Sequence, residues 1–196
     1  LYELDGGEVL VNDNSVSEYT LQSLRTQIAT VSQDVMLFND TIASNIAFGS
    51  RQSIDDKTLH AACKAAHAHD FISKLPDGYE TLVGENGIML SGGQKQRLSI
   101  ARALLTPSDL IIMDNVLSAV DYETERIILK GVFNRIQEQS LLVVSHRVSA
   151  LEYMDKILVL EHGEIIARGT HTQLLDSSAY YRETWELQQH ESETPT

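Results

Sequence analysis

The sequence predicts an α/β fold with a mostly parallel central sheet. Leu110–Asp114 is a short, continuous apolar run that ends in a carboxylate, and Leu141–Val144 repeats the apolar pattern, as is typical of strands buried on both faces. A helical stretch from about Tyr122 to Gln137 separates the two runs. A strand, a helical connection and a second buried strand together predict a parallel βαβ unit.

The elements on either side of this unit follow from similar patterns. Asp55–Ile72 carries apolar residues at helical spacing on one face, and a helix from Ser91 to Leu105 begins at a capping serine and ends before Pro107. Tyr181 and Trp185 share one stripe of the last helix, which predicts packing in a core. The other expected elements are, in order, a strand at Glu8–Asn12 after Gly6-Gly7, a strand at Ile28–Ser32, a turn at Pro76–Gly78, a hairpin of Ile157–Leu160 and Glu164–Arg168, and helices at Thr172–Leu175 and Ala179–Gln189.

Composition excludes several classes of protein. The chain has 196 residues, of which 42% are hydrophobic, so it suits one globular domain and not a disordered chain. Its net charge of −13 argues against nucleic acid as a partner. Cys63 is the single cysteine, which rules out an internal disulfide and favours a reducing compartment. The sequence opens at Leu1 without an initiator methionine, and we expect a cut end there.

The start of the helix at Ser91 predicts an anion site. Leu90-Ser91-Gly92-Gly93-Gln94 places two glycines in the first helical turn, where backbone N–H groups lack partners within the helix. Such groups lie at the positive end of the helix dipole and can bind a phosphate. The alternative is a serine-capped helix after a turn, with no ligand.

Polar residues follow the predicted strands. Asp114 ends one buried strand, where it could hold Mg²⁺ through water, and His146 follows the next strand. Gln33 follows the early strand, and Asp121 lies seven residues after Asp114. Each has a plain alternative: a capping aspartate, a surface glutamine or a histidine satisfied by hydrogen bonds. Their shared position at strand ends, in order around the Ser91 helix, favours a ligand site.

Together these segments resemble the ATP-binding domain of an exporter-type ABC transporter over about residues 3–190. The resemblance implies a P-loop NTPase-like ABC ATPase core with a mostly parallel sheet, a helical subdomain at about 51–107 and an antiparallel β edge, followed by a polar tail at 191–196 that we expect to be frayed. The motifs that carry it are the signature at Leu90–Gln94, the Q-loop at Gln33, the Walker B strand at Leu110–Asp114, the D-loop at Ser118–Asp121, the switch histidine at His146 and the X-loop at Val83–Gly87.

The resemblance also implies an activity and its partners: hydrolysis of ATP with Mg²⁺, coupled to transport. The partners are a second ABC ATPase domain and the transmembrane domain of the exporter, at the cytoplasmic face of a membrane, most simply a bacterial inner membrane. The implied roles are Mg²⁺ binding by Asp114, sensing of the ion and attacking water by Gln33, contact with the γ-phosphate by His146, binding of the partner's ATP by Leu90, Ser91, Gly92, Gly93 and Gln94, bridging of the dimer by Asp121, and contact with a coupling helix by Glu85.

Two departures from the family pattern change these expectations. No G-x-x-x-x-G-K-[ST] segment occurs in the chain, so we expect a domain without its N-terminal Walker A part and an isolated chain that is inactive. Asn115 stands where active members carry the general-base glutamate, and an amide cannot accept a proton at neutral pH. The pattern resembles the degenerate half of a heterodimeric exporter, which we favour over a homodimer.

Two other interpretations remain open. The chain could be a binding-only half that completes a partner's ATP site. It could also be a non-transport ABC ATPase of DNA repair or chromosome organisation, although those heads insert coiled coils where this chain has only residues 34–89. The spacing of His60, Cys63 and His67 could suggest a metal site, which we discount because two helical turns separate the histidines by about 10 Å and Cys63 lies on the apolar stripe.

Overall fold

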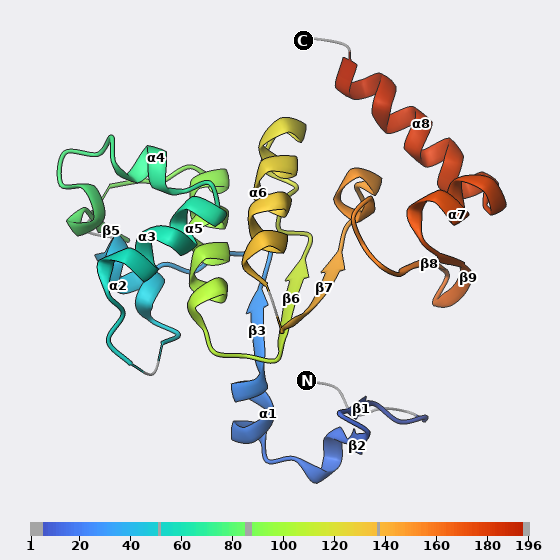
Figure 1. Ribbon diagram of the computed structural model, residues 1–196, viewed down its shortest axis with the longest axis horizontal. Helices are drawn as coiled ribbons and strands as arrows, with labels where there is room; N and C mark the ends of the chain where they lie inside the picture. Colours follow the sequence, from blue (N-terminus) through green and yellow to red (C-terminus); the bar gives the residue numbers. More distant parts are fainter. Residues whose placement is uncertain (1–5, 51, 85–87, 137, 194–196) are drawn as a thin grey trace.

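A three-stranded parallel sheet forms the centre of the protein, described here from a computed structural model (Figure 1). The strand order is β3 (Ile28–Val31), β6 (Leu110–Asp114) and β7 (Ser140–Val144). The connection from β6 to β7 contains α6 (Tyr122–Arg135), so the predicted parallel βαβ unit is confirmed. The described residues are 6–50, 52–84, 88–136 and 138–193.

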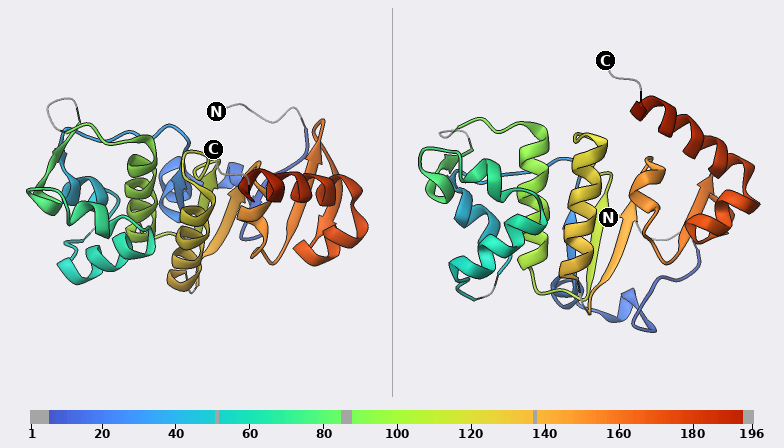
Figure 2. Two further views of the ribbon diagram at one scale, coloured as in Figure 1. Left: turned by 90° about the horizontal axis from the view of Figure 1, so that it is seen from above. Right: turned by 45° about the horizontal axis from the view of Figure 1, so that its top comes forward.

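The two faces of this sheet differ in burial. Ile111 and Met113 are buried on one face, where α5 (Gly92–Leu105) packs against β3 and α6 lies over the sheet (Figure 2). On the opposite face, Leu142 and Val144 are each about half exposed, at 50% and 49%. The prediction that both apolar runs are buried on both faces is therefore wrong, because these packed helices lie on one side.

A group of helices lies beside the sheet (Figure 1), where α2 (Ile42–Ala47) and α3 (Asp56–Ala65) both pack against α5. The predicted single helix over Asp55–Ile72 is wrong: it ends at Ala65, and a separate turn, α4 (His69–Ile72), follows. His67 has a left-handed φ of 52°, and the N–H of Ala68 donates to the Cys63 carbonyl at 2.7 Å. This Schellman ending uses histidine in place of the usual glycine.

Two-stranded hairpins lie near both ends of the chain, as predicted. β8 (Ile157–Glu161) and β9 (Glu164–Gly169) are joined through His162 and Gly163, whose positive φ values of 49° and 83° fit a type I′ turn. The expected strand at Glu8–Asn12 is shorter. The remaining elements are β1 (Leu10–Val11), β2 (Asn14–Ser15), β4 (Asp40–Thr41), β5 (Leu82–Val83), α1 (Leu21–Gln27), and the 3₁₀ turns η1 (Val16–Glu18), η2 (Gly78–Glu80) and η3 (Val148–Leu151).

The C-terminal helices form a second, smaller core with the β8–β9 hairpin. α7 (His171–Ser177) contributes the buried Leu174, and α8 (Ala179–Glu193) contributes Tyr181 and part of Trp185, as their shared stripe predicts. α8 continues through the first residues of the expected polar tail. Over the described ranges, no helix combines the length and the apolar character needed to cross a bilayer.

Candidate functional site

The carboxyl ends of the three parallel strands meet at one edge of the sheet. Val31 pairs with Met113, and Asp114 pairs with Val144, so the loops after β3, β6 and β7 start at nearly the same level. Gln33, Asp114 and His146 are all exposed at this edge. The structure thus places these three residues after the carboxyl ends of three adjacent strands, while their chemical roles stay predictions.

Asn115 begins a tight turn directly after β6. Its φ of 50° is left-handed, a conformation that asparagine adopts more readily than most residues. Its N–H donates to the carbonyl of Val144 at 2.8 Å, and its own carbonyl accepts from the hydroxyl of Ser118 at 3.1 Å. The backbone at the expected general-base position is therefore fixed to β7 on one side and to the following turn on the other.

The start of α5 is a capping box. The Ser91 hydroxyl accepts from the N–H of Gln94 at 3.3 Å, and the Gln94 side chain accepts from the N–H of Ser91 at 2.9 Å. Leu90 is buried and anchors this end of the helix, whereas Ser91 and Gly92 are exposed. The N–H groups of Gly92 and Gly93 lie in the first turn, where no carbonyl one turn earlier can accept from them.

Gly93 brings this helix tip against the loop that follows β6. A Cβ built on Gly93 would lie 3.2 Å from the carbonyl oxygen of Ala119 and 3.3 Å from a methyl carbon of Val120. A Cβ on Gly92 would meet only the Ala119 Cβ, at an ordinary 3.9 Å. The tip is thus exposed to solvent on one side and in contact with the D-loop segment on the other.

Asp121 caps the N-terminus of α6. A capping aspartate is the alternative to a ligand-binding residue that its position in the sequence allowed. Its carboxylate accepts from the N–H of Thr124 at 2.9 Å and from the Thr124 hydroxyl at 2.7 Å. These two hydrogen bonds lower the pKa of Asp121 below its ordinary value. The carboxylate is exposed, so capping leaves it on the protein surface.

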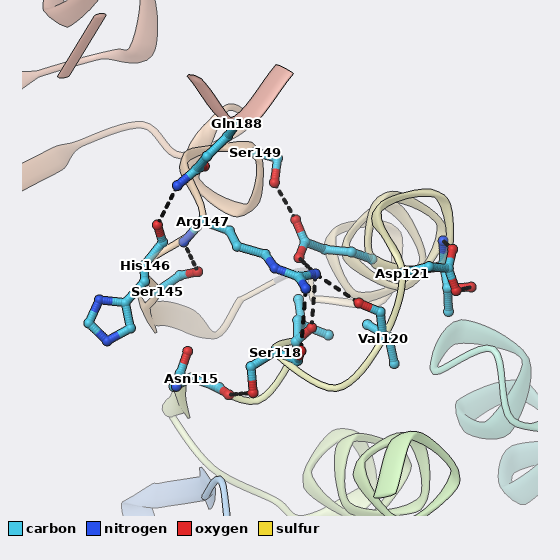
Figure 3. Close-up of polar contacts among 12 residues, drawn as sticks. Asn115, Ser118, Val120, Asp121, Ser145, His146, Arg147, Ser149 and Gln188 are labelled. Carbon is cyan, nitrogen blue, oxygen red and sulfur yellow. Dashed lines mark hydrogen bonds and ion pairs between the residues drawn. The ribbon is translucent and has the colours of Figure 1, made fainter. Parts of the chain in front are cut away.

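Arg147 is a residue of this site that the sequence analysis missed. It follows His146 directly, and its guanidinium reaches from the loop after β7 to the loop after β6 (Figure 3). It donates to three carbonyl groups of that loop: Leu117 at 3.3 Å, Ser118 at 3.3 Å and Val120 at 2.8 Å. One side chain therefore holds the turn between Asn115 and α6.

A buried carboxylate completes this contact. Glu125 of α6 is fully buried, and it accepts from Arg147 at 3.0 Å and from the Ser149 hydroxyl at 2.5 Å. A buried carboxylate is costly unless it is paired in this way. The sequence does carry a signal for it, since Glu125 lies on the apolar stripe that α6 forms with Ile128 and Val132.

The loop that carries His146 is held by α8 as well. Gln188 donates to the carbonyl of His146 at 2.9 Å and accepts from the N–H of Val148 at 2.8 Å. The Ser145 hydroxyl accepts from the N–H of Arg147 at 2.9 Å. The side chains of His146 and Arg147 point in different directions from this loop (Figure 3).

An apolar groove lies near the Q-loop. Its volume is about 320 Å³, and two of its lining methionines, Met36 and Met89, are 78% and 88% exposed. Glu85, which we expect to contact a coupling helix, falls outside the described residues. The groove is lined by Val35, Met36, Leu37, Gly84, Ile88, Met89, Leu90 and Lys95.

The set of His60, Cys63 and His67, discounted above as a metal site, contains a buried cysteine. Cys63 is fully buried, and burial raises the pKa of its thiol to about 11. His60 instead stacks on Tyr79, with ring centroids 4.6 Å apart. Among the described residues, no cluster of three metal-ligating side chains is present.

Comparisons with known proteins find related sequences and a related structure. The family model described as "ABC transporter" matches residues 1–118. The chain is 45% identical over 94% of its length to the ATP-dependent lipid A-core flippase of Shewanella oneidensis, and 44% identical over 95% to the flippase of that name in Escherichia coli K12. It spans about a third of their length, 31% and 32%.

A solved structure, a bacterial Atm1-family ABC exporter with ATP bound, matches the fold with a TM-score of 0.87. Its sequence is 39% identical, and the match covers 95% of this chain and 33% of that one. The α/β core expected from the sequence is confirmed by this match. The chain belongs to the ABC transporter family.

Proposed function

We propose that this chain is the ATP-binding and ATP-hydrolysing part of an ABC exporter. The observation that carries the proposal is the single edge at which Gln33, Asp114 and His146 follow three adjacent parallel strands. Ligands of open α/β sheets bind at this edge. The exporter relatives and the ATP-bound structural neighbour support the same assignment.

The residues at this edge fit Mg²⁺ and the phosphates of ATP. Asp114 offers an exposed carboxylate and Gln33 an amide oxygen, the donor types that Mg²⁺ prefers. The bound ion would neutralise the charge that develops on the phosphates. His146 would hydrogen-bond the γ-phosphate, and its position is fixed because Gln188 holds its carbonyl.

The tip of α5 would bind a nucleotide held by a second ABC ATPase domain. Ser91 and Gly92 face solvent, and the capping box leaves the N–H groups of Gly92 and Gly93 available to a phosphate. Leu90 and Gln94 would support this contact: the buried Leu90 anchors this end of the helix, and Gln94 closes the capping box. Asp121, exposed at the start of α6, would bridge the two domains.

Asn115 supports a heterodimer in which the partner carries out most of the hydrolysis. An amide in the general-base position would slow the site on this chain's own strands by about 10²–10⁴-fold. The same residue supports a second candidate function, a binding-only half that completes the partner's site and does not turn over ATP itself.

The groove lined by Met36 and Met89 would contact the transmembrane domain, and Glu85 would contact a coupling helix of that domain. Exposed methionines give an adaptable apolar surface for a partner helix. This contact would place the domain at the cytoplasmic face of a membrane, and the bacterial relatives named above support a bacterial inner membrane.

Two measurements test these proposals. Titration calorimetry of the isolated chain with MgATP should show no measurable binding, because the chain has no Walker A motif to hold the triphosphate. An affinity in the micromolar range would contradict this. The second measurement is phosphate release with and without an active partner domain. An enzyme releases phosphate at its own site, whereas a binding-only half does not.

A further inference from the structure

We propose that Arg147 is a positioning residue that couples the tip of α5 to His146 through the backbone of Leu117–Asp121. The inference rests on the proposed function, because it assigns that coupling a role in ATP hydrolysis. It is carried by a series of contacts between the two ends of the candidate site, of which those made by Arg147 are drawn in Figure 3.

The first contact joins the helix tip to the D-loop segment. Gly93 lies so close to Ala119 and Val120 that a Cβ at its position would come within 3.2 Å and 3.3 Å of them. Such contacts are tighter than most real Cβ contacts, so a methyl group at Gly93 would require Ala119 or Val120 to move by a few tenths of an ångström. A shift of the segment would therefore displace the tip that faces the partner's nucleotide.

The second contact joins the segment to Arg147. A guanidinium is a rigid, planar group with five donors, and here it reaches the carbonyls of Leu117, Ser118 and Val120. A lysine ammonium is a compact group and cannot reproduce this spread of donors. The shape of the arginine side chain thus fixes the path of the turn.

The third contact fixes the guanidinium itself. Glu125 accepts from Arg147 at 3.0 Å and has no solvent exposure, and Ser149 holds its other oxygen. Since Glu125 belongs to α6, the guanidinium cannot move without leaving a buried charge unpaired. The segment, α6 and the loop after β7 therefore form one unit.

The last link, from Arg147 to His146, runs along the backbone. Arg147 is its immediate neighbour, and the backbone of this loop is bound by Ser145 and by Gln188. A displacement at Ala119 would be transmitted to the histidine that faces this chain's own nucleotide. Arg147 would thereby link the nucleotide at this chain's own strands to the nucleotide that the partner holds against the tip of α5.

The test uses the assembled exporter and two variants. Arg147→Lys keeps a positive charge beside Glu125, so the chain should fold, but it loses the fork that spans three carbonyls. We expect kcat for ATP hydrolysis to fall by about tenfold or more with KM changed less than about twofold, because the misplaced groups act in the transition state. Arg182→Ala, which removes an exposed arginine that donates to the Leu175 carbonyl, is the matched control and should leave both constants unchanged.

A double-mutant cycle supplies the second readout. If Arg147 acts through the segment, the losses in kcat from Arg147→Lys and Gly93→Ala will not add, whereas independent effects would add. Full activity of Arg147→Lys with an unchanged melting temperature, or strictly additive losses, would overturn the inference. An inactive wild-type exporter would instead contradict the proposed function, so the two failures are distinguishable.

Discussion

Gly93 and Ala119 lie close together although 26 residues separate them in the sequence: a Cβ built on Gly93 would lie 3.2 Å from the carbonyl oxygen of Ala119. This close approach joins the first turn of α5 to the loop after β6. Two glycines at this tip thus serve different purposes: Gly93 permits a close approach within the chain, while Gly92 lies at the surface.

This difference predicts unequal effects of alanine at the two positions. Gly93→Ala should lower the free energy of unfolding by about 1–3 kcal/mol, the usual effect of overpacking, because the new methyl group meets backbone. Gly92→Ala is the matched control and should be neutral or slightly stabilising, since its Cβ has ordinary space and alanine favours helix. Urea unfolding of both variants measures the difference, and equal stabilities would show that the close contact does not exist in solution.

Asn115 offers a direct test of the impaired-base proposal. Asn115→Glu in the assembled exporter should raise hydrolysis at this chain's site by up to about 10²–10⁴-fold, because a carboxylate can accept the proton from water. Glutamate is less tolerant of a φ of 50° than asparagine, so the variant should also be slightly less stable.

Asn115→Gln separates the two effects, because it has the size and backbone cost of glutamate without the carboxylate. The rate of phosphate release should rise for the glutamate variant alone. If neither variant is faster than the wild type, the missing base does not limit this site.

Asp121 predicts a pH-dependent contribution to stability. The two hydrogen bonds from Thr124 lower the pKa of Asp121 in the folded state, so its stabilisation is fully present above the ordinary value of 3.8 and is lost as the pH falls through the lower folded value. Asp121→Ala should cost about 1 kcal/mol at neutral pH, as for other N-caps. Unfolding curves from pH 7 to pH 3 should show that the difference in free energy of unfolding between the wild type and Asp121→Ala narrows only in the acidic range. A difference independent of pH would argue against a charged cap.

The sequence reveals the local parts of this site well. Ser91 is a recognisable N-cap because its partner, Gln94, lies three residues away, and Asp114 is placed at a strand end by the apolar run before it. The end of α3 is not recognisable in this way, because His67 occupies the left-handed position where a glycine would have signalled a stop.

Contacts between distant segments are what the sequence conceals. Arg147 and Glu125 are 22 residues apart, and neither residue type by itself indicates a partner. The exposure of Leu142 and Val144 is equally hidden, because an apolar strand looks the same whether helices cover one face or both. Tertiary packing decides these features, and the fold had to be seen to find them.

The central proposal is that the tip of α5 binds the phosphates of a nucleotide held by another domain. Orthovanadate trapped with ADP takes the place of the γ-phosphate and, under ultraviolet light, cleaves the peptide backbone next to it. In the assembled exporter, cleavage mapped by mass spectrometry should occur in this chain at Ser91 or the adjoining Gly92. Cleavage elsewhere in the exporter with the Leu90–Gln94 segment intact would contradict the account.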